Sequence, residues 1–321
     1  MNVFISGGAG FIGSHMVTKL LSFNDKITSV IVYDNFSSGS YDHLNLFENE
    51  KKLKIIDGDI KHLGLLTKSM IGADLVIHYA ANPDIAKAVK QPDIDFWEGT
   101  YLTQNILEAM RINGVPYILY TSGSGVYGEV PDEAFNESYG PCFPISTYGA
   151  SKLACEALIS SYCHMFDIRA RAFRFANVVG PKQTHGVGYD FIRRLKNNPK
   201  ELRILGDGTQ SKSYIYVDDV INAMLITYED SLKVGKPIFD VFNVATADYI
   251  TVTEIAEIAC KVAGLNIKDV NFQYSGGDRG WKGDVPKVLF DIEKIKKLKW
   301  KAAKNSYEAI EKSIESMEGE F

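Results

Sequence analysis

Short apolar, β-rich runs alternate with longer stretches of helical period through the first 175 residues of this 321-residue chain. Strands that are joined through helices pair in parallel by right-handed crossovers, so that helices cover both faces of the sheet. The alternation therefore predicts an α/β fold built on a doubly wound parallel sheet. The expected strands are 3–6, 29–33, 53–57, 75–79, 117–121 and 168–175, and the expected helices are 11–21, 97–113 and 148–165.

The alternation gives way to loop-rich sequence after residue 180, and a smaller second region is expected to begin near Asn177. Lysines in the segment near the end of the chain accompany Ile292, Ile295 and Leu298 at helical spacing, which predicts a helix with a solvated face. Further elements expected in this part are helices at 189–197, 217–228 and 253–263 and a strand at 239–244.

A glycine-rich loop follows the first predicted strand directly and opens an apolar helix. It reads Gly7-Gly8-Ala9-Gly10-Phe11-Ile12-Gly13, and its glycines fit either of two dinucleotide spacings, starting at Gly7 or at Gly8. Such a loop lets the backbone approach a pyrophosphate, whose charge is stabilised by the N-terminus of the helix. Asp34, 21 residues after Gly13, can accept hydrogen bonds from an adenosine ribose and repel a 2′-phosphate. The loop in this context indicates a Rossmann domain that binds NAD rather than NADP.

Composition narrows the class of protein. Hydrophobic residues at 45% and charged residues at 23% are typical of an ordinary globular chain, and the net charge of −5 gives no basic field for nucleic acid. No run of 18 apolar residues and no signal-peptide core occur, so no membrane association and a cytoplasmic location are expected. The four cysteines and six histidines show no metal-ligand or disulfide spacing, which predicts free thiols and no metal.

Tyr148 and Lys152 are four residues apart at the start of a predicted helix, so both side chains lie on one face, about one turn apart. A tyrosine titrates near ~10, and a neighbouring ammonium group that stabilises the phenolate lets it take a proton at neutral pH. The pair alone is a weak pattern, because a packed tyrosine and a surface lysine often have this spacing. Together with the glycine loop it favours a functional pair, in which Lys152 and a nicotinamide stabilise the tyrosinate.

Eight motifs in a fixed order carry a resemblance that extends from the first residue to about Trp300. The chain resembles the extended short-chain dehydrogenase/reductases, specifically nucleotide-sugar epimerases of the UDP-glucose 4-epimerase type. The motifs are Ser6-Gly7-Gly8-Ala9-Gly10-Phe11-Ile12-Gly13, Asp34-Asn35-Phe36-Ser37-Ser38-Gly39, Gly58-Asp59-Ile60, His78-Tyr79-Ala80-Ala81, Val126-Tyr127-Gly128, Tyr148-Gly149-Ala150-Ser151-Lys152, Arg174-Phe175-Ala176-Asn177-Val178-Val179-Gly180-Pro181 and Tyr216-Val217-Asp218-Asp219-Val220.

The resemblance implies a site and a domain organisation. It implies a dinucleotide-binding domain at 1–176, with 217–262 packing back on it, and a substrate-binding region at 177–216 and 263–321. Helices 97–113 and 148–165 would form a homodimer interface. The residues implied to bind NAD are Gly7, Gly10, Phe11, Ile12, Gly13, Asp34, Asn35, Asp59, Ile60, Tyr79, Ala80, Ala81, Tyr148 and Lys152, and those implied to bind a nucleotide-sugar substrate are Asn177, Lys212 and Arg279.

The implied reaction inverts C4 of a nucleotide-linked hexose or hexuronate through a 4-keto intermediate. Tyr148 takes the C4 hydroxyl proton while the C4 hydrogen moves to NAD as a hydride and later returns to the opposite face of the sugar. Departures from the family pattern leave a related reductase, decarboxylase or dehydratase, or a non-catalytic NAD-binding sensor, as alternatives.

Four differences from family patterns bear on catalysis and substrate binding. Gly123 stands where the family has a catalytic serine or threonine, so we expect Ser124 to supply that hydroxyl, with Ser122 or a water as the alternative. Dehydratases of the family carry an Asp-Glu pair directly after this position, whereas this chain has Ser124-Gly125, which disfavours a dehydratase. Lys212 replaces a family arginine, and Arg279 lies two positions upstream of the usual one.

Overall fold

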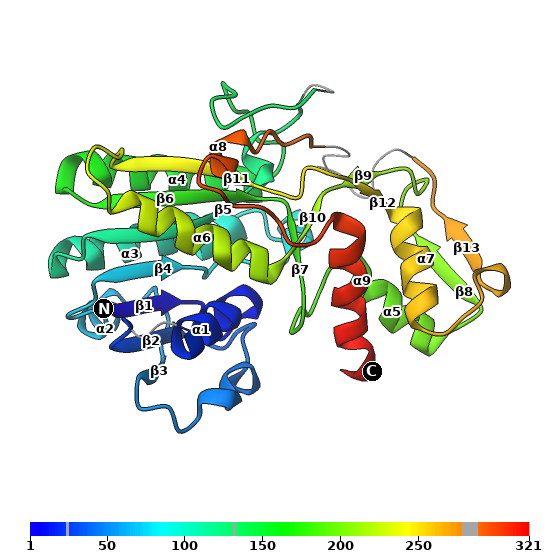
Figure 1. Cartoon of the computed structure of the whole chain (residues 1–321), viewed down its shortest axis with the longest axis horizontal. Helices are drawn as coiled ribbons and strands as arrows, with labels where there is room; N and C mark the ends of the chain where they lie inside the picture. The colour runs from blue at the N-terminus through cyan, green and yellow to red at the C-terminus, as the bar shows by residue number, and fades with distance from the viewer. Residues whose placement is uncertain (24–25, 131–132, 278–287, 321) are drawn as a thin grey trace. The chain divides into compact units, whose positions relative to one another are not determined.

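A computed structural model describes residues 1–23, 26–130, 133–277 and 288–320 of the chain (Figure 1). The described residues divide into two compact units. The first unit consists of Met1–Tyr127, Cys142–Arg174 and Ala223–Phe242, and the second of Gly128–Pro141, Phe175–Asn222 and Asn243–Phe321. Of the segment 217–262, only 223–242 therefore belongs to the first unit.

A seven-stranded sheet forms the centre of the first unit, in the order β3-β2-β1-β4-β5-β6-β11. The pairs β3–β2, β2–β1, β1–β4 and β4–β5 are parallel. This confirms the doubly wound sheet and all six strands expected in the first 175 residues, and β11 adds a seventh strand next to β6. The strands are β1 (Asn2–Ser6), β2 (Ser29–Asp34), β3 (Leu53–Asp57), β4 (Leu75–His78), β5 (Tyr117–Gly123), β6 (Arg169–Phe175) and β11 (Phe239–Val244).

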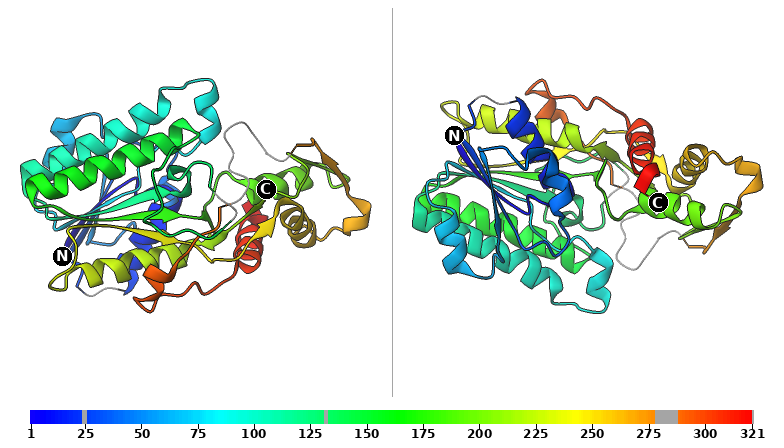
Figure 2. Two further views of the ribbon diagram at one scale, coloured as in Figure 1. Left: turned by 90° about the horizontal axis from the view of Figure 1, so that it is seen from above. Right: turned by 90° about the horizontal axis from the view of Figure 1, so that it is seen from below.

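Helices cover both faces of this sheet, with α3 and α4 on one face and α1 and α6 on the other (Figure 2). Their apolar sides build a core around fully buried side chains such as Phe4, Ile106 and Ile159. The α-helices are α1 (Phe11–Phe23), α2 (Leu63–Ser69), α3 (Tyr101–Asn113), α4 (Thr147–Phe166) and α6 (Val217–Ser231), and the shorter 3-10 helices are η1 (Tyr41–Phe47), η2 (Ile85–Val89) and η4 (Ser124–Val126).

The helix expected at 97–113 is divided in two. A π-helical turn, η3 (Phe96–Thr100), precedes α3, and the amide of Tyr101 donates to the carbonyl of Phe96, five residues earlier. The wide turn is stabilised by tertiary contact, since Gly99 lies so close to α4 that a Cβ there would be 2.4 Å from the Ser151 Oγ. Helical periodicity does not reveal such an insertion.

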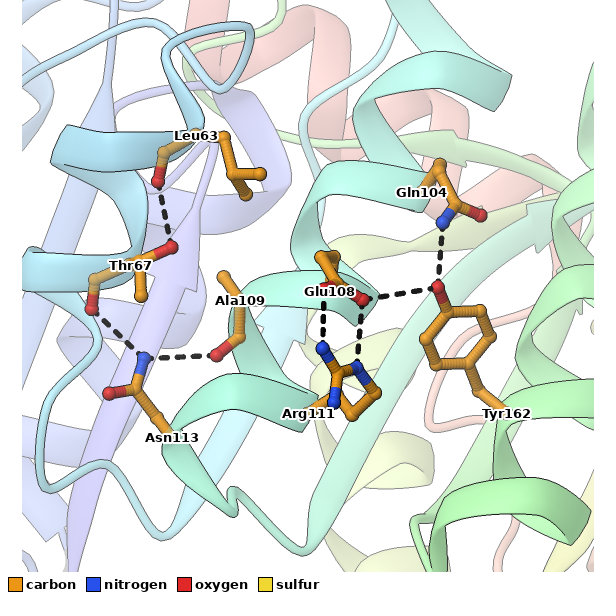
Figure 3. Close-up of polar contacts among 8 residues, drawn as sticks. All are labelled: Leu63, Thr67, Gln104, Glu108, Ala109, Arg111, Asn113 and Tyr162. Atoms are coloured by element: carbon orange, nitrogen blue, oxygen red, sulfur yellow. Dashed lines mark hydrogen bonds and ion pairs between the residues drawn. The ribbon is translucent and has the colours of Figure 1, made fainter.

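Polar contacts fix α3 against its neighbours (Figure 3). The Asn113 side-chain amide donates to the Thr67 carbonyl of α2 at 2.9 Å, which joins the C-terminal ends of these helices. On the opposite side of α3, Glu108 accepts two hydrogen bonds from Arg111, at 2.7 and 2.9 Å, and the Tyr162 hydroxyl of α4 points toward it. These contacts align α3 with α4.

The second unit packs three helices, α5 (Val187–Asn197), α7 (Val252–Val262) and α9 (Ser306–Met317), against one another. Three two-stranded sheets accompany them, with β7 paired to β10, β8 to β13 and β9 to β12. The remaining elements are β7 (Asn177–Val179), β8 (Glu201–Ile204), β9 (Ser211–Lys212), β10 (Tyr214–Tyr216), β12 (Ile250–Thr251), β13 (Asn271–Tyr274), α8 (Glu293–Lys296), η5 (Ile267–Asp269) and η6 (Glu318–Glu320).

The prediction of a helix from Ile292 to Leu298 was wrong in its length, because α8 is a single turn. The chain leaves the helix at Lys299, whose φ of +63° is left-handed, and then buries Trp300. The Trp300 indole N–H donates to the Asp219 carbonyl at 3.1 Å. Burying the Trp300 side chain stabilises the protein more than further turns of a lysine-rich helix would.

None of the helices in the described residues is both long and apolar enough to cross a membrane. Among the same residues, no cluster of three or more His, Cys, Asp or Glu side chains could hold a metal ion.

Candidate functional site

The glycine loop lies at the carboxyl edge of the central sheet, where the strand order reverses between β1 and β4. In doubly wound sheets this switch point is the place where ligands bind. Gly7 has a φ of +72°, and a Cβ on it would lie 2.7 Å from the Ala80 amide nitrogen that follows β4. A Cβ on Gly13 would lie 2.2 Å from the Gly7 carbonyl oxygen. Only glycine fits these two positions, because the loop, α1 and the end of β4 approach one another at backbone distance.

The N-terminus of α1 is suited to an anion. Its first turn carries no acidic residue, and the first-turn amides of any helix have no acceptor within the helix. Within the loop, the Gly10 amide donates to the Gly7 carbonyl at 3.2 Å, which turns the backbone into the helix. Phe11 and Ile12, half-buried in the first turn, follow this bend. The loop therefore fits the pyrophosphate of a dinucleotide such as NAD.

Asp34, at the end of β2, holds the glycine loop. One carboxylate oxygen accepts the Ala9 amide and the other accepts the Phe36 amide, each at 2.9 Å. Burial raises the pKa of this carboxyl, and the two amide hydrogen bonds oppose the rise. The side chain expected to face a ribose is thus also a support of the phosphate loop.

Ala9 has a second support that no sequence motif indicates. Its carbonyl oxygen accepts the Ser40 amide at 3.1 Å and the His43 Nδ1–H at 2.8 Å. Neither residue belongs to a dinucleotide motif, and only the fold brings the 40–43 segment over the loop.

The other residues expected at the cofactor also lie at the carboxyl ends of strands. The Asn35 amide approaches an Asp59 carboxylate oxygen at 3.4 Å across the ends of β2 and β3. Ile60 is buried, and its carbonyl accepts the Asn105 side-chain amide at 3.1 Å. Tyr79, followed by Ala80 and Ala81, donates its amide to the Ser6 carbonyl at 2.9 Å, next to the glycine loop.

Tyr148 and Lys152 stand in the first turns of α4, which is capped by the Ser146 hydroxyl accepting the Gly149 amide. The Lys152 ammonium nitrogen lies 5.5 Å from the centre of the Tyr148 ring and donates to the Thr121 carbonyl at 2.8 Å. Lys152 is 6% exposed, so its charge acts in a medium of low polarity. The arrangement can stabilise a tyrosinate.

His78 lies behind this pair and is fully buried. Its Nδ1 is 2.7 Å from the Ser6 hydroxyl, and its Nε2 is 3.1 Å from the Thr103 hydroxyl. Burial, with the Lys152 charge as a smaller cause, lowers the pKa of His78 to about 3. The ring is therefore neutral at physiological pH and serves as a hydrogen-bonding link between β1, β4 and α3.

Position 123 is open toward Tyr148. Among the described residues, and apart from its chain neighbours, the Tyr148 Cε1 is the one atom within 4 Å of a Cβ placed on Gly123, at 4.0 Å. Ser124 begins the turn η4, and this turn lies against α4, because a Cβ on Gly149 would be 2.2 Å from the Gly125 carbonyl oxygen. Ser124 is thus held next to the turn of α4 that carries Tyr148.

The alternative hydroxyl, that of Ser122, forms a hydrogen bond to a buried carboxylate. It is 5% exposed and donates to Glu156 at 2.6 Å. Glu156 in turn forms a buried ion pair with Arg174 at 2.7 Å. The Ser122 hydroxyl therefore completes a buried charged cluster.

Asn177 and Lys212, two of the residues expected to bind substrate, belong to the second unit. Asn177 is exposed at the start of β7, and its amide side chain donates to the Ser213 carbonyl at 3.3 Å. Lys212 is half-buried in β9. Arg279 lies outside the described residues.

Comparison with known proteins identifies the family. Residues 3–245 match the family described as "NAD dependent epimerase/dehydratase family". The chain belongs to this family. As a member of the NAD-dependent epimerase/dehydratase family it is an enzyme and uses NAD, as the sequence predicted.

Relatives within the family share the full length of the chain. A putative UDP-glucose 4-epimerase of Methanocaldococcus jannaschii is 30% identical and covers 98% of both chains. A crystal structure of a UDP-galactose 4-epimerase is 34% identical, with a TM-score of 0.87 and full coverage of both chains. The UDP-N-acetylglucosamine 4-epimerase from Methanobrevibacter ruminantium M1, in complex with UDP-N-acetylmuramic acid, is 29% identical, with a TM-score of 0.86 and coverage of 100% of this chain and 99% of that one.

Proposed function

We propose that this enzyme inverts C4 of a UDP-linked hexose or hexuronate through a 4-keto intermediate. The observation that carries the proposal is the Lys152 ammonium held 5.5 Å from the centre of the Tyr148 ring, at the sheet edge that also bears the glycine loop. Full-length similarity to two UDP-sugar 4-epimerases supports the reaction and the uridine base.

Tyr148 acts as the general base and acid. Its phenolate takes the proton of the C4 hydroxyl, and the Lys152 charge stabilises the phenolate before this step. The glycine loop and Asp34 would hold NAD, which would supply the hydride acceptor and donor for C4. Tyr148 then gives the proton back to the C4 oxygen of the inverted sugar, so no net redox change occurs.

Ser124 orients the C4 hydroxyl in this proposal. The turn η4 holds Ser124 against α4, whereas the Ser122 hydroxyl bonds Glu156. Asn177, Lys212 and Arg279 are proposed to bind the diphosphate, where Lys212 acts as a point charge rather than a bidentate fork. Loose contacts to the hexose would let the ketone turn over while the nucleotide stays anchored.

Two other functions have weaker support. A 4,6-dehydratase needs an acid and a base for C5 and C6, and the Asp-Glu pair that serves them in dehydratases is replaced by Ser124-Gly125. A redox sensor needs the cofactor site but has no use for a tyrosine with a buried lysine beside it.

Interconversion of a UDP-hexose or UDP-hexuronate with its C4 epimer is the expected activity. In deuterated water the C4 hydrogen is expected to stay unexchanged, because it moves as hydride and never as a proton. Incubating the protein with UDP-, dTDP-, CDP- and GDP-sugars and identifying the products by NMR tests this. Deuterium at C5 of the product would indicate a dehydratase, and net growth of absorbance at the NADH wavelength would indicate a dehydrogenase.

Cofactor selectivity is expected to follow from Asp34. A 2′-phosphate beside this carboxylate would be a desolvated like-charge contact. NAD should therefore bind at least about 10²-fold more tightly than NADP. Calorimetric titration of cofactor-free protein with each dinucleotide measures the ratio. Equal affinities would show that Asp34 does not face the ribose.

The first unit is proposed as the dinucleotide-binding domain, and the second as the substrate-binding region.

A homodimer through α3 and α4 is proposed as well, because Ile112, Met165 and Phe166 have large apolar side chains that are exposed at the ends of these helices. Sedimentation equilibrium of wild type and Met165→Glu distinguishes a dimer from a monomer. A cytoplasmic location is proposed because the buried cysteines Cys155, Cys163 and Cys260 form no disulfide.

A further inference from the structure

A buried carboxylate connects three segments of the first unit. Asp95, directly before η3, is 2% exposed. Its Oδ2 accepts the Thr147 hydroxyl at 2.7 Å, and its Oδ1 accepts the Asn82 side-chain amide at 2.9 Å. Its backbone carbonyl accepts the Ser151 hydroxyl at 2.7 Å. One residue thus holds the loop after β4, the π-turn and the beginning of α4.

Each of the two contacts to α4 lies directly before one member of the Tyr148–Lys152 pair. Thr147 is the first residue of the helix, and Ser151 follows one turn later, directly before Lys152. Residues of one helix move together. Anchoring positions 147 and 151 therefore sets the rotation of Tyr148 and Lys152 about the helix axis and their position along it. Gly99 strengthens the anchor, since its missing Cβ lets η3 approach Ser151 closely, and the Thr100 hydroxyl lies 2.9 Å from the Ser151 hydroxyl.

The contact between Asp95 and Thr147 is rigid because its acceptor is a buried carboxylate. A buried carboxylate must keep its hydrogen-bond donors, because an unsatisfied buried charge is costly. It also lies next to the N-terminus of the 20-residue helix α4, where the helix dipole favours negative charge. The Asp95–Thr147 hydrogen bond is therefore a stronger restraint than one between two neutral groups.

We infer that Asp95, acting through Thr147, is a positioning residue for Tyr148 and Lys152. The inference rests on the proposed function, in which these two side chains transfer the C4 proton. Asn82 ties the same carboxylate to the segment that follows Ala81, so the tyrosine is set relative to a part of the expected cofactor site. Displacement of a reacting group by an ångström can cost about 10²-fold in rate, which gives this restraint a measurable effect.

The test compares Thr147→Val with Thr147→Ser. Valine keeps the shape of threonine, excludes water and removes the hydroxyl donor, whereas serine keeps the donor. We expect Thr147→Val to lower kcat about 10-fold, with NAD affinity within about 2-fold of wild type, and Thr147→Ser to stay within about 2-fold in both quantities. Hydrogen exchange of the hydrogen-bonded 149–152 amides should rise several-fold in the valine variant alone.

A double-mutant cycle with Asp95→Asn completes the test. If the two residues act as one unit, Asp95→Asn with Thr147→Val should lower kcat no more than the larger single effect. Equal behaviour of the valine and serine variants in kcat and amide exchange would overturn the inference, and so would additive losses in the cycle. The exchange measurement needs no substrate, so it tests the positioning role even if the wild-type protein shows no epimerase activity.

Discussion

Replacing Tyr148 by phenylalanine is expected to lower C4 inversion by about 10²–10⁴-fold, the usual contribution of general acid–base catalysis. The variant loses the only group proposed to take and return the C4 hydroxyl proton, while the ring that packs near Lys152 stays in place. NAD affinity should change little, because the glycine loop and Asp34 are untouched. The rate at saturating substrate, with NAD content verified for each preparation, measures the effect.

Tyr162→Phe is the matched control for this variant. Tyr162 is on the same helix, and its hydroxyl bonds Gln104 on the side of α4 that faces α3 (Figure 3). The control should therefore retain the wild-type rate. Full activity in Tyr148→Phe would remove the tyrosine from the mechanism and leave proton transfer to another group.

Removing the Ser124 hydroxyl should cost about 10²-fold in the rate of C4 inversion, because a substrate hydroxyl that loses its orienting partner is misplaced relative to Tyr148. Gly123→Ser in the Ser124→Ala background should recover part of the rate. The part of the chain that the structure describes leaves room for that side chain, since beyond the chain neighbours the nearest atom to a Cβ at position 123 is the Tyr148 Cε1, at 4.0 Å. Comparing the three rates at saturating substrate measures the effect.

Ser122→Ala separates this role from a structural one. Its hydroxyl bonds the buried Glu156, so we expect a loss of about 1–3 kcal/mol in the free energy of unfolding and little change in rate. Denaturant unfolding and turnover are measured on the same preparation. If Ser124→Ala keeps the wild-type rate while Ser122→Ala loses most of it, the orienting hydroxyl belongs to Ser122.

The parts of this protein that local sequence determines are the strands, the glycine loop and the Tyr148–Lys152 spacing. Strand and helix periodicity follow from which face each residue presents. The requirement for glycine at position 7 follows from backbone geometry next to a strand end. One local signal was missed, since Asn305 and Glu308 form a capping box that marks the start of α9.

Tertiary structure decided the features that depend on contacts between distant residues. It placed β11 beside β6, opened the π-turn at Gly99 against Ser151, and ended α8 early so that Trp300 could be buried. It also directed the Ser122 hydroxyl to Glu156 and the Asp95 carboxylate to Thr147. Such pairings have no sequence period, because hydrogen bonds to buried charges form only after packing brings separate elements together.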